Sequence, residues 1–447
     1  MDGSQYTRIM AAWTLDELAR RDRFGDRIHF WLAAAVCFTL PVNGGWAGFL
    51  LGPLVAWGAL RTLCWRRYLP AGPACVLLPA TAWIGLLAIS LTWSPDPRQE
   101  WHQLWSQRWI VAIPLLWPLM DRWRWLLLFT LAGCLGQTTV QTVEGIMEWS
   151  SPQGRRISGF ETHPRTVAVW SAGVIVGLVG FHLSGFLHRR RWLLGCIPPL
   201  LAIVLSGSRG ALFALAIGLP VVVGVLGVRR LLTARGLASM VAAILVAGTS
   251  LVVFHDRIMP QFERAVESVT SITTDGQATD IRLLWWRSAL RQWDNHPLLG
   301  YGLGGTAEAL RSDPELTADQ RVSKSHLSVA VFNQPHSVYL QILLEGGLVG
   351  VGTFALLLFA IFRVAWRNSL HHPLGAIAIG GLVIWMTTAT FDAWHTRSQP
   401  LAFLWFTALF AAFDPGWLTR DSKKNAAEDE RPDQTSALSK STPTDGR

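Results

Sequence analysis

The sequence is poor in charge and in tyrosine. Only 15% of its 447 residues are Asp, Glu, Lys or Arg, whereas a soluble domain typically carries about 25%. Hydrophobic residues make up 51% of the chain, and there are 24 Trp but only 4 Tyr. These values exclude an ordinary soluble, a disordered and a collagen-like protein. They indicate a polytopic membrane protein that buries most of its surface in lipid.

Motifs for metal, nucleotide and disulfide chemistry are also missing. The five cysteines stand in or beside apolar stretches and form no CxxC pair, so they predict neither a disulfide framework nor a zinc site. The sequence has no DxD, HExxH, GKS/T or GxSxG pattern, and no motif for binding DNA or RNA. We therefore expect no cofactor and no nucleic-acid partner.

Twelve apolar segments are candidates for membrane spans, each close to the length that crosses a bilayer. They lie at 28–43, 46–65, 73–93, 108–120, 123–147, 166–187, 192–207, 210–228, 237–254, 345–362, 374–391 and 400–414.

The basic residues follow these spans with a regular bias. If residues 1–27, which lack the layout of a signal peptide, stay in the cytosol, the inside segments hold 24 of the 39 Lys and Arg but only 12 of the 30 Asp and Glu. Each inside loop then has at least two basic residues. This is the positive-inside pattern, and it predicts that both termini face the cytosol. The net charge of +9 thus matches an anionic inner leaflet.

The expected fold is therefore all-α, with about 12 transmembrane helices. It divides into a cytosolic segment at 1–27, nine spans within 28–254, a periplasmic loop at 255–335, three spans within 336–416 and a disordered cytosolic tail at 417–447. A loop as long as this one is usually functional. Within it, Asp280 can cap an amphipathic helix that runs to about Trp293.

Arg209 is the first candidate for chemistry. It lies in Ser206-Gly207-Ser208-Arg209-Gly210, at the outer mouth of a predicted span, where an arginine is costly if it enters hydrocarbon. A guanidinium and free N–H groups at a helix start can bind a phosphate together. The alternative is an interfacial anchor whose head group reaches out to water.

His336 is the second candidate. It lies where the long loop re-enters the membrane, just before Tyr339, and a neutral imidazole there can accept a proton near pH 7. The alternative is a histidine that only bonds to a loop carbonyl.

Other basic residues on the outer side form a weaker set. Arg282, Arg287 and Arg291 share the loop helix, and they either bind substrate or pair on the surface with Asp280 or Asp294.

Two further outer loops carry candidates. Arg156 and Arg165 stand in a short loop before the sixth span, where they can bind a phosphate or anchor the chain at the interface. Asp392 follows the eleventh span and either orients His336 or simply ends a helix.

Taken together, these residues resemble a known group, the O-antigen ligases and polymerases of bacterial envelopes. The resemblance covers the span count, the orientation and the long outer loop, and the ligase type is favoured by His336 followed at a fixed distance by Gly347. Ser337 departs from the pattern, since many members have Asn there. The resemblance itself rests on four motifs. They are Ser206 to Gly210, Arg282 with Trp286, Pro297 with Gly300 and Gly302, and the run Pro335, His336, Tyr339, Leu340, Gln341, Glu345, Gly347.

The resemblance implies a GT-C-like fold and a reaction. A glycan on undecaprenyl diphosphate is transferred, with inversion and without metal or ATP, to a sugar hydroxyl of lipid A–core. By resemblance His336 is the general base, and Arg209 and Arg282 stabilise the leaving diphosphate. The residues Arg156, Arg165, Arg287, Tyr339 and Asp392 are then expected to contact donor or acceptor.

Three alternatives remain at this point. An O-antigen polymerase uses the same donor with a second lipid-linked glycan as acceptor, and a protein O-oligosaccharyltransferase uses a Ser or Thr side chain. A lipid-glycan transporter would move the substrate without forming a bond, but it predicts charged residues within spans. The candidates here gather at one face, which favours chemistry there.

Overall fold

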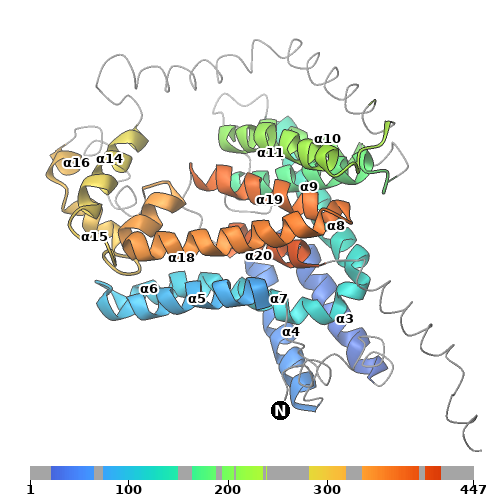
Figure 1. The fold of residues 1–447 in the computed structure, drawn as a ribbon, viewed down its shortest axis with the longest axis horizontal. Coiled ribbons are helices and arrows are strands. Elements are labelled where there is room, and N and C mark those ends of the chain that lie inside the picture. Colours follow the sequence, from blue (N-terminus) through green and yellow to red (C-terminus); the bar gives the residue numbers. More distant parts are fainter. Residues whose placement is uncertain are drawn as a thin grey trace, which may run out of the picture.

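The computed structural model describes most of the chain, in separate stretches. These are residues 22–64, 74–148, 164–187, 194–205, 208–234, 238, 281–318, 335–391 and 398–413. Within these stretches the secondary structure is entirely helical (Figure 1).

The helices of the first half of the chain form from its apolar runs and the turns between them. They are α3 (Arg23–Thr39), α4 (Gly44–Cys64), α5 (Ala74–Ser90), η1 (Leu91–Trp93), α6 (Pro97–Ser106), η2 (Gln107–Val111), α7 (Ala112–Leu116), η3 (Trp117–Arg122), α8 (Trp123–Glu148), α9 (Pro164–Leu183), α10 (Ile197–Leu205) and α11 (Arg209–Val228).

The second half has three short helices that precede three long ones. They are α14 (Ile281–Trp293), α15 (Thr306–Arg311), α16 (Pro314–Ala318), α18 (Val338–Asn368), α19 (Pro373–Ala389) and α20 (Ser398–Ala412).

Helical structure lies at each predicted span that falls within the described residues. Five helical runs there are long and apolar enough to cross a membrane, namely Gly44–Cys64, Ala74–Trp93, Glu100–Met147, Gly210–Val228 and Val338–Asn368. Four shorter apolar helices lie at Ala168–Leu183, Leu194–Leu205, Pro373–Ala389 and Pro400–Ala412. The total of twelve spans stays a prediction. The segment 237–254, the loop at 255–280, the tail at 417–447 and all but the end of 1–27 lie outside the described residues, apart from residue 238.

The predicted span at 108–120 is not a separate straight helix. The chain there forms two 3-10 pieces, η2 and η3, on either side of the single short helix α7. Pro114 and Pro118 explain the break, because each lacks the N–H that an α-helix needs and crowds the preceding turn. The helical run from Glu100 to Met147 is therefore irregular between α6 and α8.

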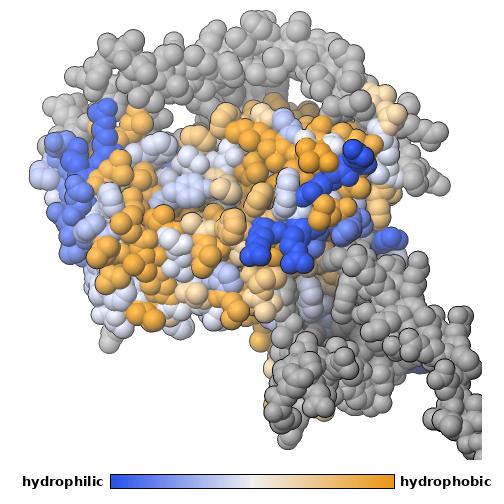
Figure 2. All heavy atoms as spheres, in the orientation of Figure 1, coloured by the Kyte–Doolittle hydropathy of each residue, from blue (hydrophilic) through white to orange (hydrophobic). Residues whose placement is uncertain are grey.

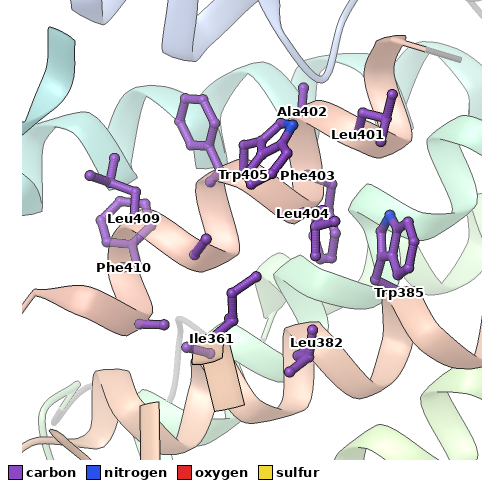
Figure 3. Packing of buried hydrophobic residues seen from close by; sticks show 14 of the residues in the cluster. Ile361, Leu382, Trp385, Leu401, Ala402, Phe403, Leu404, Trp405, Leu409 and Phe410 are labelled. Carbon is purple, nitrogen blue, oxygen red and sulfur yellow. The ribbon is translucent and has the colours of Figure 1, made fainter. Parts of the chain in front are cut away.

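Two apolar helices near the carboxyl end form the centre of the bundle. All of residues 400–411 in α20 are buried, and α19 is buried along most of its length. A helix that is apolar all round belongs in the interior of a bundle. Figure 3 shows side chains of α20, among them Leu404 and Trp405, packing with Trp385 of α19 and Ile361 of α18.

Helices on the outside of the bundle leave apolar side chains uncovered. Phe49 and Leu63 of α4 are each 79% exposed, and Leu78 of α5 is 70% exposed. Figure 2 shows hydrophobic residues over the middle of the visible face, with hydrophilic ones gathered over α14 and α16 and again toward the opposite side. Such an exposed apolar surface is what a membrane protein presents to lipid.

One end of the bundle, which we call the basic end, collects the predicted inside loops. Arg61 of α4 bonds to Asp22 (Nε–Oδ2, 2.8 Å), and Arg122 pairs with Asp26 at the start of α3. Across the bundle, Arg229 after α11 donates to Ser369 Oγ at 3.2 Å.

An aromatic contact links the part of the basic end near α3 and α8 to the part near α11 and α19. Trp123 at the start of α8 meets His372, just before α19, edge to face. Loops that the charge bias assigns to one side of the membrane thus lie together at one end. The side that this end faces stays a prediction.

Candidate functional site

The opposite end, which we call the loop end, carries α14, α15, α16 and the start of α18. The turn Pro335-His336-Ser337 leads into α18, and His336 has φ +52°, a left-handed conformation. Residues with a side chain enter this region rarely, at a cost of about 1–3 kcal/mol unless the surroundings hold them there. Ser337 then returns to extended backbone, and its carbonyl accepts the first helical bond, from Gln341 N at 3.0 Å.

Two tryptophans of α14 hold this turn. The indole of Trp285 lies against the imidazole of His336, with ring centroids 4.6 Å apart. The Nε1–H of Trp286 donates to the carbonyl of Pro335 at 3.0 Å. The strained residue is thereby fixed from one side through its ring and from the other through its preceding carbonyl, and His336 itself is only half-buried.

The glycine-rich segment after α14 fits into a kink of α18. Gly347 interrupts the helix with φ +58° and ψ −155°. The main chain of 297–302 forms bonds there that the helix ladder cannot, and these satisfy the buried backbone groups. The four bonds are Leu348 N to Pro297 O (2.9 Å), Val349 N to Leu298 O (3.1 Å), Tyr301 N to Leu344 O (2.8 Å) and Gly302 N to Glu345 O (3.0 Å).

Glycine is required where the two backbones touch. A Cβ on Gly300 would lie 2.4 Å from the Leu344 carbonyl oxygen, and one on Gly347 would lie 2.3 Å from that of Leu298. Gly300, like Gly347, has a positive φ. The spacing of these glycines in the sequence thus reflects a close backbone approach.

A buried carboxylate supports the same junction. Glu345 is 3% exposed, and its Oε1 accepts hydrogen bonds from Thr306 Oγ1 and from Gln341 Nε2, both at 2.9 Å. Glu100 of α6 approaches the neighbouring Gly304 so closely that a Cβ there would collide with it. Helices α6, α15 and α18 thus meet at the kink of α18.

Asp313 and Arg291 tie the three short helices together. Arg291 Nη2 lies 2.7 Å from Asp313 Oδ2, and Oδ1 of the same carboxylate accepts from the amides of Glu315 and Leu316 at the start of α16. Burial alone would raise the pKa of Asp313. The neighbouring Ser288 hydroxyl and Arg291 guanidinium outweigh burial, and the net pKa is lowered. Arg291 therefore has a structural role, with Asp313 and Glu315 at the start of α16 as its acidic partners. Asp280, which the sequence also suggested, lies outside the described residues.

The helix ends that carry the other candidates lie toward the same end of the bundle. Arg209 is the first residue of α11, whose next residue Gly210 faces Phe391 just after α19. Tyr339, in the first turn of α18, donates its hydroxyl to the carbonyl of Met386 in α19 at 2.9 Å. The carboxyl end of α19 thus connects the start of α11 to the start of α18.

Arg165 and Arg282 are placed by their helices. Arg282 lies in the first turn of α14, one turn before Trp285 and Trp286. Arg165 lies in the first turn of α9, a helix of about 30 Å. The far end of α9 is at the basic end, where Leu183 accepts from Thr233 N at 3.0 Å, so Arg165 lies toward the loop end.

The remaining predicted residues divide as follows. Arg287 is exposed on α14. Arg156 and Asp392 lie outside the described residues, as do the side chains of Arg165, Arg209 and Arg282. The contacts that would assign a role to these five are therefore expectations from the sequence.

Sequence reasoning missed the residues that hold the site. The sequence predicted an amphipathic helix that contains Trp285 but gave that residue no role, and it marked Glu345 only as part of a motif. The available signal was the pair Trp285-Trp286, because two adjacent tryptophans cannot both lie on one face of a helix and the second needs a partner of its own. Among the described residues no group of three or more His, Cys, Asp or Glu is arranged to hold a metal ion.

Comparison with known proteins gives one match. Residues 193–355 match the model of a family described as O-antigen ligase. The match covers just over a third of the chain and contains α11, α14, the His336 turn and the kink of α18. No curated protein matches the chain significantly. The match supports membership of the O-antigen ligase/polymerase superfamily.

Proposed function

We propose that this chain, which carries an O-antigen ligase domain, transfers a glycan from undecaprenyl diphosphate to a sugar hydroxyl of lipid A–core at the periplasmic face of the inner membrane. The reaction is a direct displacement at the anomeric carbon. The acceptor oxygen forms the new glycosidic bond and loses its proton, the bond to the diphosphate breaks, and the configuration inverts. No metal or nucleotide takes part.

In this proposal His336 is the general base. The observation that carries the proposal is the turn at His336, where a half-buried imidazole is held in a left-handed conformation between two tryptophan contacts. Strained backbone persists where the surroundings fix it, and it is concentrated at functional sites. The proton of the acceptor hydroxyl passes to the imidazole as the oxygen attacks.

Arginines supply the charge that the leaving group needs. The diphosphate gains negative charge as the bond breaks, and prepositioned guanidinium groups stabilise that charge without rearrangement. We assign this role to Arg209 and Arg282. The start of α11 adds the positive end of a helix of 20 residues to the guanidinium of Arg209.

The weaker candidates are assigned to substrate contact. Arg287 and Arg165 bind the donor phosphates or the acceptor core from α14 and α9, and Arg156 and Asp392 do so from the loops beside them. Tyr339 positions the start of α18 through its bond to Met386 and presents its ring edge to the sugar.

The test is a strain that lacks this gene, with envelope glycolipids separated on a gel and the lipid carrier analysed in parallel. Full-length glycan that accumulates on undecaprenyl diphosphate, next to bare lipid A–core, supports the ligase. Lipid A–core that carries a single repeat unit would assign the chain to the polymerases. Normal lipopolysaccharide with a missing glycoprotein glycan would assign it to protein O-oligosaccharyltransfer.

A further inference from the structure

A large apolar cavity lies at the basic end, away from His336. Its volume is about 330 Å³, and its walls come from α8, α9, α19, α20 and the turn after α9. This size falls within the range of small-molecule sites. The lining residue Leu128 is 41% exposed, so the cavity reaches the surface of the bundle.

The lining is almost purely hydrocarbon and aromatic. It runs from Trp123 and Leu374 at the basic end to Trp170 and Gly381 nearer the middle of the bundle. Thr130 and Thr407 add two hydroxyls, and that of Thr130 already donates to the carbonyl of Leu126 at 2.9 Å. Apolar walls without polar partners do not hold water, and without an occupant they lose their dispersion contacts. A hydrocarbon chain is the occupant that such walls fit.

Arg124 is the charged residue of this lining. It is exposed, and its guanidinium carbon lies 5.1 Å from the ring centre of Phe186 and 5.6 Å from that of Trp123. The aromatic faces keep the cation at the mouth while its donors stay available. The sequence continues the wall residue Leu187 with His188-Arg189-Arg190-Arg191, so positive charge is concentrated in this part of the chain.

We propose that the cavity binds one acyl chain of an anionic phospholipid from the surrounding leaflet, with the phosphate held by Arg124. The wall that α9 contributes runs from Trp170 to Phe181, about 16 Å at 1.5 Å per residue, which is comparable with one hydrocarbon leaflet, about half of a 30 Å core. The combination of an apolar slot and a cation at its mouth distinguishes an anionic lipid from a zwitterionic one.

This site is separate from the proposed glycan transfer. His336 lies at the loop end, and α19, about 25 Å long, runs between the two regions, from Leu374 in the cavity wall to Met386 beside Tyr339. The lipid is therefore not the donor whose diphosphate leaves near His336. It is a structural ligand of the helices that carry the core.

One glycine offers a direct way to fill the cavity. Gly177 lines it, and a Cβ added there would meet only Ile377 Cγ2, at 4.0 Å. Gly177→Leu therefore places a side chain in the cavity with little strain on the fold. Gly224→Leu is the matched control, because Gly224 is an exposed helical residue with nothing within 4 Å of its Cβ position.

The charge is tested by a second pair. Arg124→Gln removes the cation at the mouth, whereas Arg363→Gln removes an exposed cation on α18 that does not line the cavity. The probes are phosphatidylglycerol and phosphatidylcholine with identical acyl chains. They are added to the delipidated full-length protein and counted by native mass spectrometry.

Wild type is expected to retain one phosphatidylglycerol in preference to phosphatidylcholine. Gly177→Leu should lose this single bound lipid. Arg124→Gln should still bind a lipid, but its preference for phosphatidylglycerol over phosphatidylcholine should fall about fivefold, because one cation near the membrane surface contributes about that much. Gly224→Leu and Arg363→Gln should behave as wild type. His336→Asn should also bind as wild type, so failure of the proposed function leaves this result unaffected.

Several results would overturn the proposal. Unchanged binding in Gly177→Leu would place the lipid elsewhere. Equal retention of both phospholipids by wild type would remove the role of Arg124. Displacement of phosphatidylglycerol by undecaprenyl phosphate in wild type but not in Gly177→Leu would identify the isoprenoid as the occupant. No retained lipid, together with a lower Tm for Gly177→Leu but not for Gly224→Leu, would show that a segment of this chain fills the cavity.

Discussion

The indole of Trp285 lies against the imidazole of His336, with centroids 4.6 Å apart and ring planes inclined by 32°. The two residues are 51 positions apart in sequence and belong to α14 and to the turn before α18. The position of the imidazole therefore depends on whether α14 is docked. This couples the chemistry proposed for His336 to the packing of a helix that lies outside the apolar bundle.

Replacement of His336 by Asn tests the general base. Asn, like His, enters the left-handed region more readily than most residues, so the turn and the start of α18 should be kept. Glycan transfer should fall by a factor of about 10² to 10⁴, the usual contribution of general acid–base catalysis. The measurement is the rate at which carrier-linked glycan is consumed, at matched expression and unchanged Tm. A transfer rate near wild type would remove His336 from the mechanism.

Arg209 is tested by two substitutions that differ in what they retain. Arg209→Gln removes the charge and should lower the transfer rate about 10²- to 10³-fold, as the loss of a charge-stabilising donor does elsewhere. Arg209→Lys keeps the charge without the planar fork and should recover only part of the rate. Arg367→Gln, on the exposed surface at the basic end, is the control. Equal rates for all three variants would contradict the role of Arg209.

Trp285 should act through the position of His336. Trp285→Phe keeps a ring beside the imidazole and should retain most of the activity. Trp285→Ala removes a buried aromatic side chain, a change that costs about 3–5 kcal/mol in a well-packed core, and should undock α14 and reduce transfer. Leu290→Ala on the same helix is the control, because Leu290 is 48% exposed.

Hydrogen exchange of α14 amides separates docking from chemistry in this series. Exchange should accelerate in Trp285→Ala but not in Trp285→Phe or Leu290→Ala. Full activity in Trp285→Ala, despite rapid exchange, would show that His336 does not depend on this contact.

The apolar pattern predicted the positions of the long helices well but not their interruptions. Residues such as Leu404 and Trp405 lie in a continuous apolar run, and the length of that run, 15 residues in α20, favours a helix over a strand. The kink of α18 depends on bonds between Leu348 and Pro297, which are far apart in sequence, and no local pattern encodes such a pair. The glycines in the sequence indicated a close backbone contact or an unusual conformation there, but they did not indicate which segment of the chain makes the contact.

For the candidate site, the sequence marks residues for chemistry but not the residues that support them. The residue types of His336 and Arg209, together with their position at the mouths of spans, mark them as candidates because such residues are costly near hydrocarbon. Their supports, Trp285 and Glu345, look in sequence like ordinary members of a helix. Their importance follows only from what they contact in the fold, Trp285 against a strained turn and Glu345 between Thr306 and Gln341.

Acid should loosen the three short helices through Asp313. The pKa of this carboxyl is lowered in the folded protein, so the ionised form is favoured by folding. Its stabilising effect is complete above the unfolded pKa of about 3.9 and is lost as the pH falls from there toward the lowered folded value. Asp313→Asn should remove this pH dependence and lower the stability of the α14–α16 region at neutral pH. The measurement is amide hydrogen exchange of α14 and α16 in wild type and Asp313→Asn, at pH values from about 6 to about 3 in steps of about one pH unit. An identical pH profile in the two proteins would contradict the role of Asp313.

Two adjacent glycines of α18 should respond differently to replacement by alanine. Gly347 has φ +58° and ψ −155°, a region open almost only to glycine, and a Cβ there would lie 2.3 Å from Leu298 O. Gly347→Ala should therefore destabilise the junction by about 1–3 kcal/mol or more, the usual cost of such backbone strain, and should accelerate amide exchange at Tyr301 and Gly302. Gly346 has nothing within 4 Å of its Cβ position, so Gly346→Ala should be neutral or should stabilise the helix by up to about 1 kcal/mol. Thermal unfolding of the two variants beside wild type decides the point, since equal Tm shifts would mean that the kink of α18 does not depend on the conformation of Gly347.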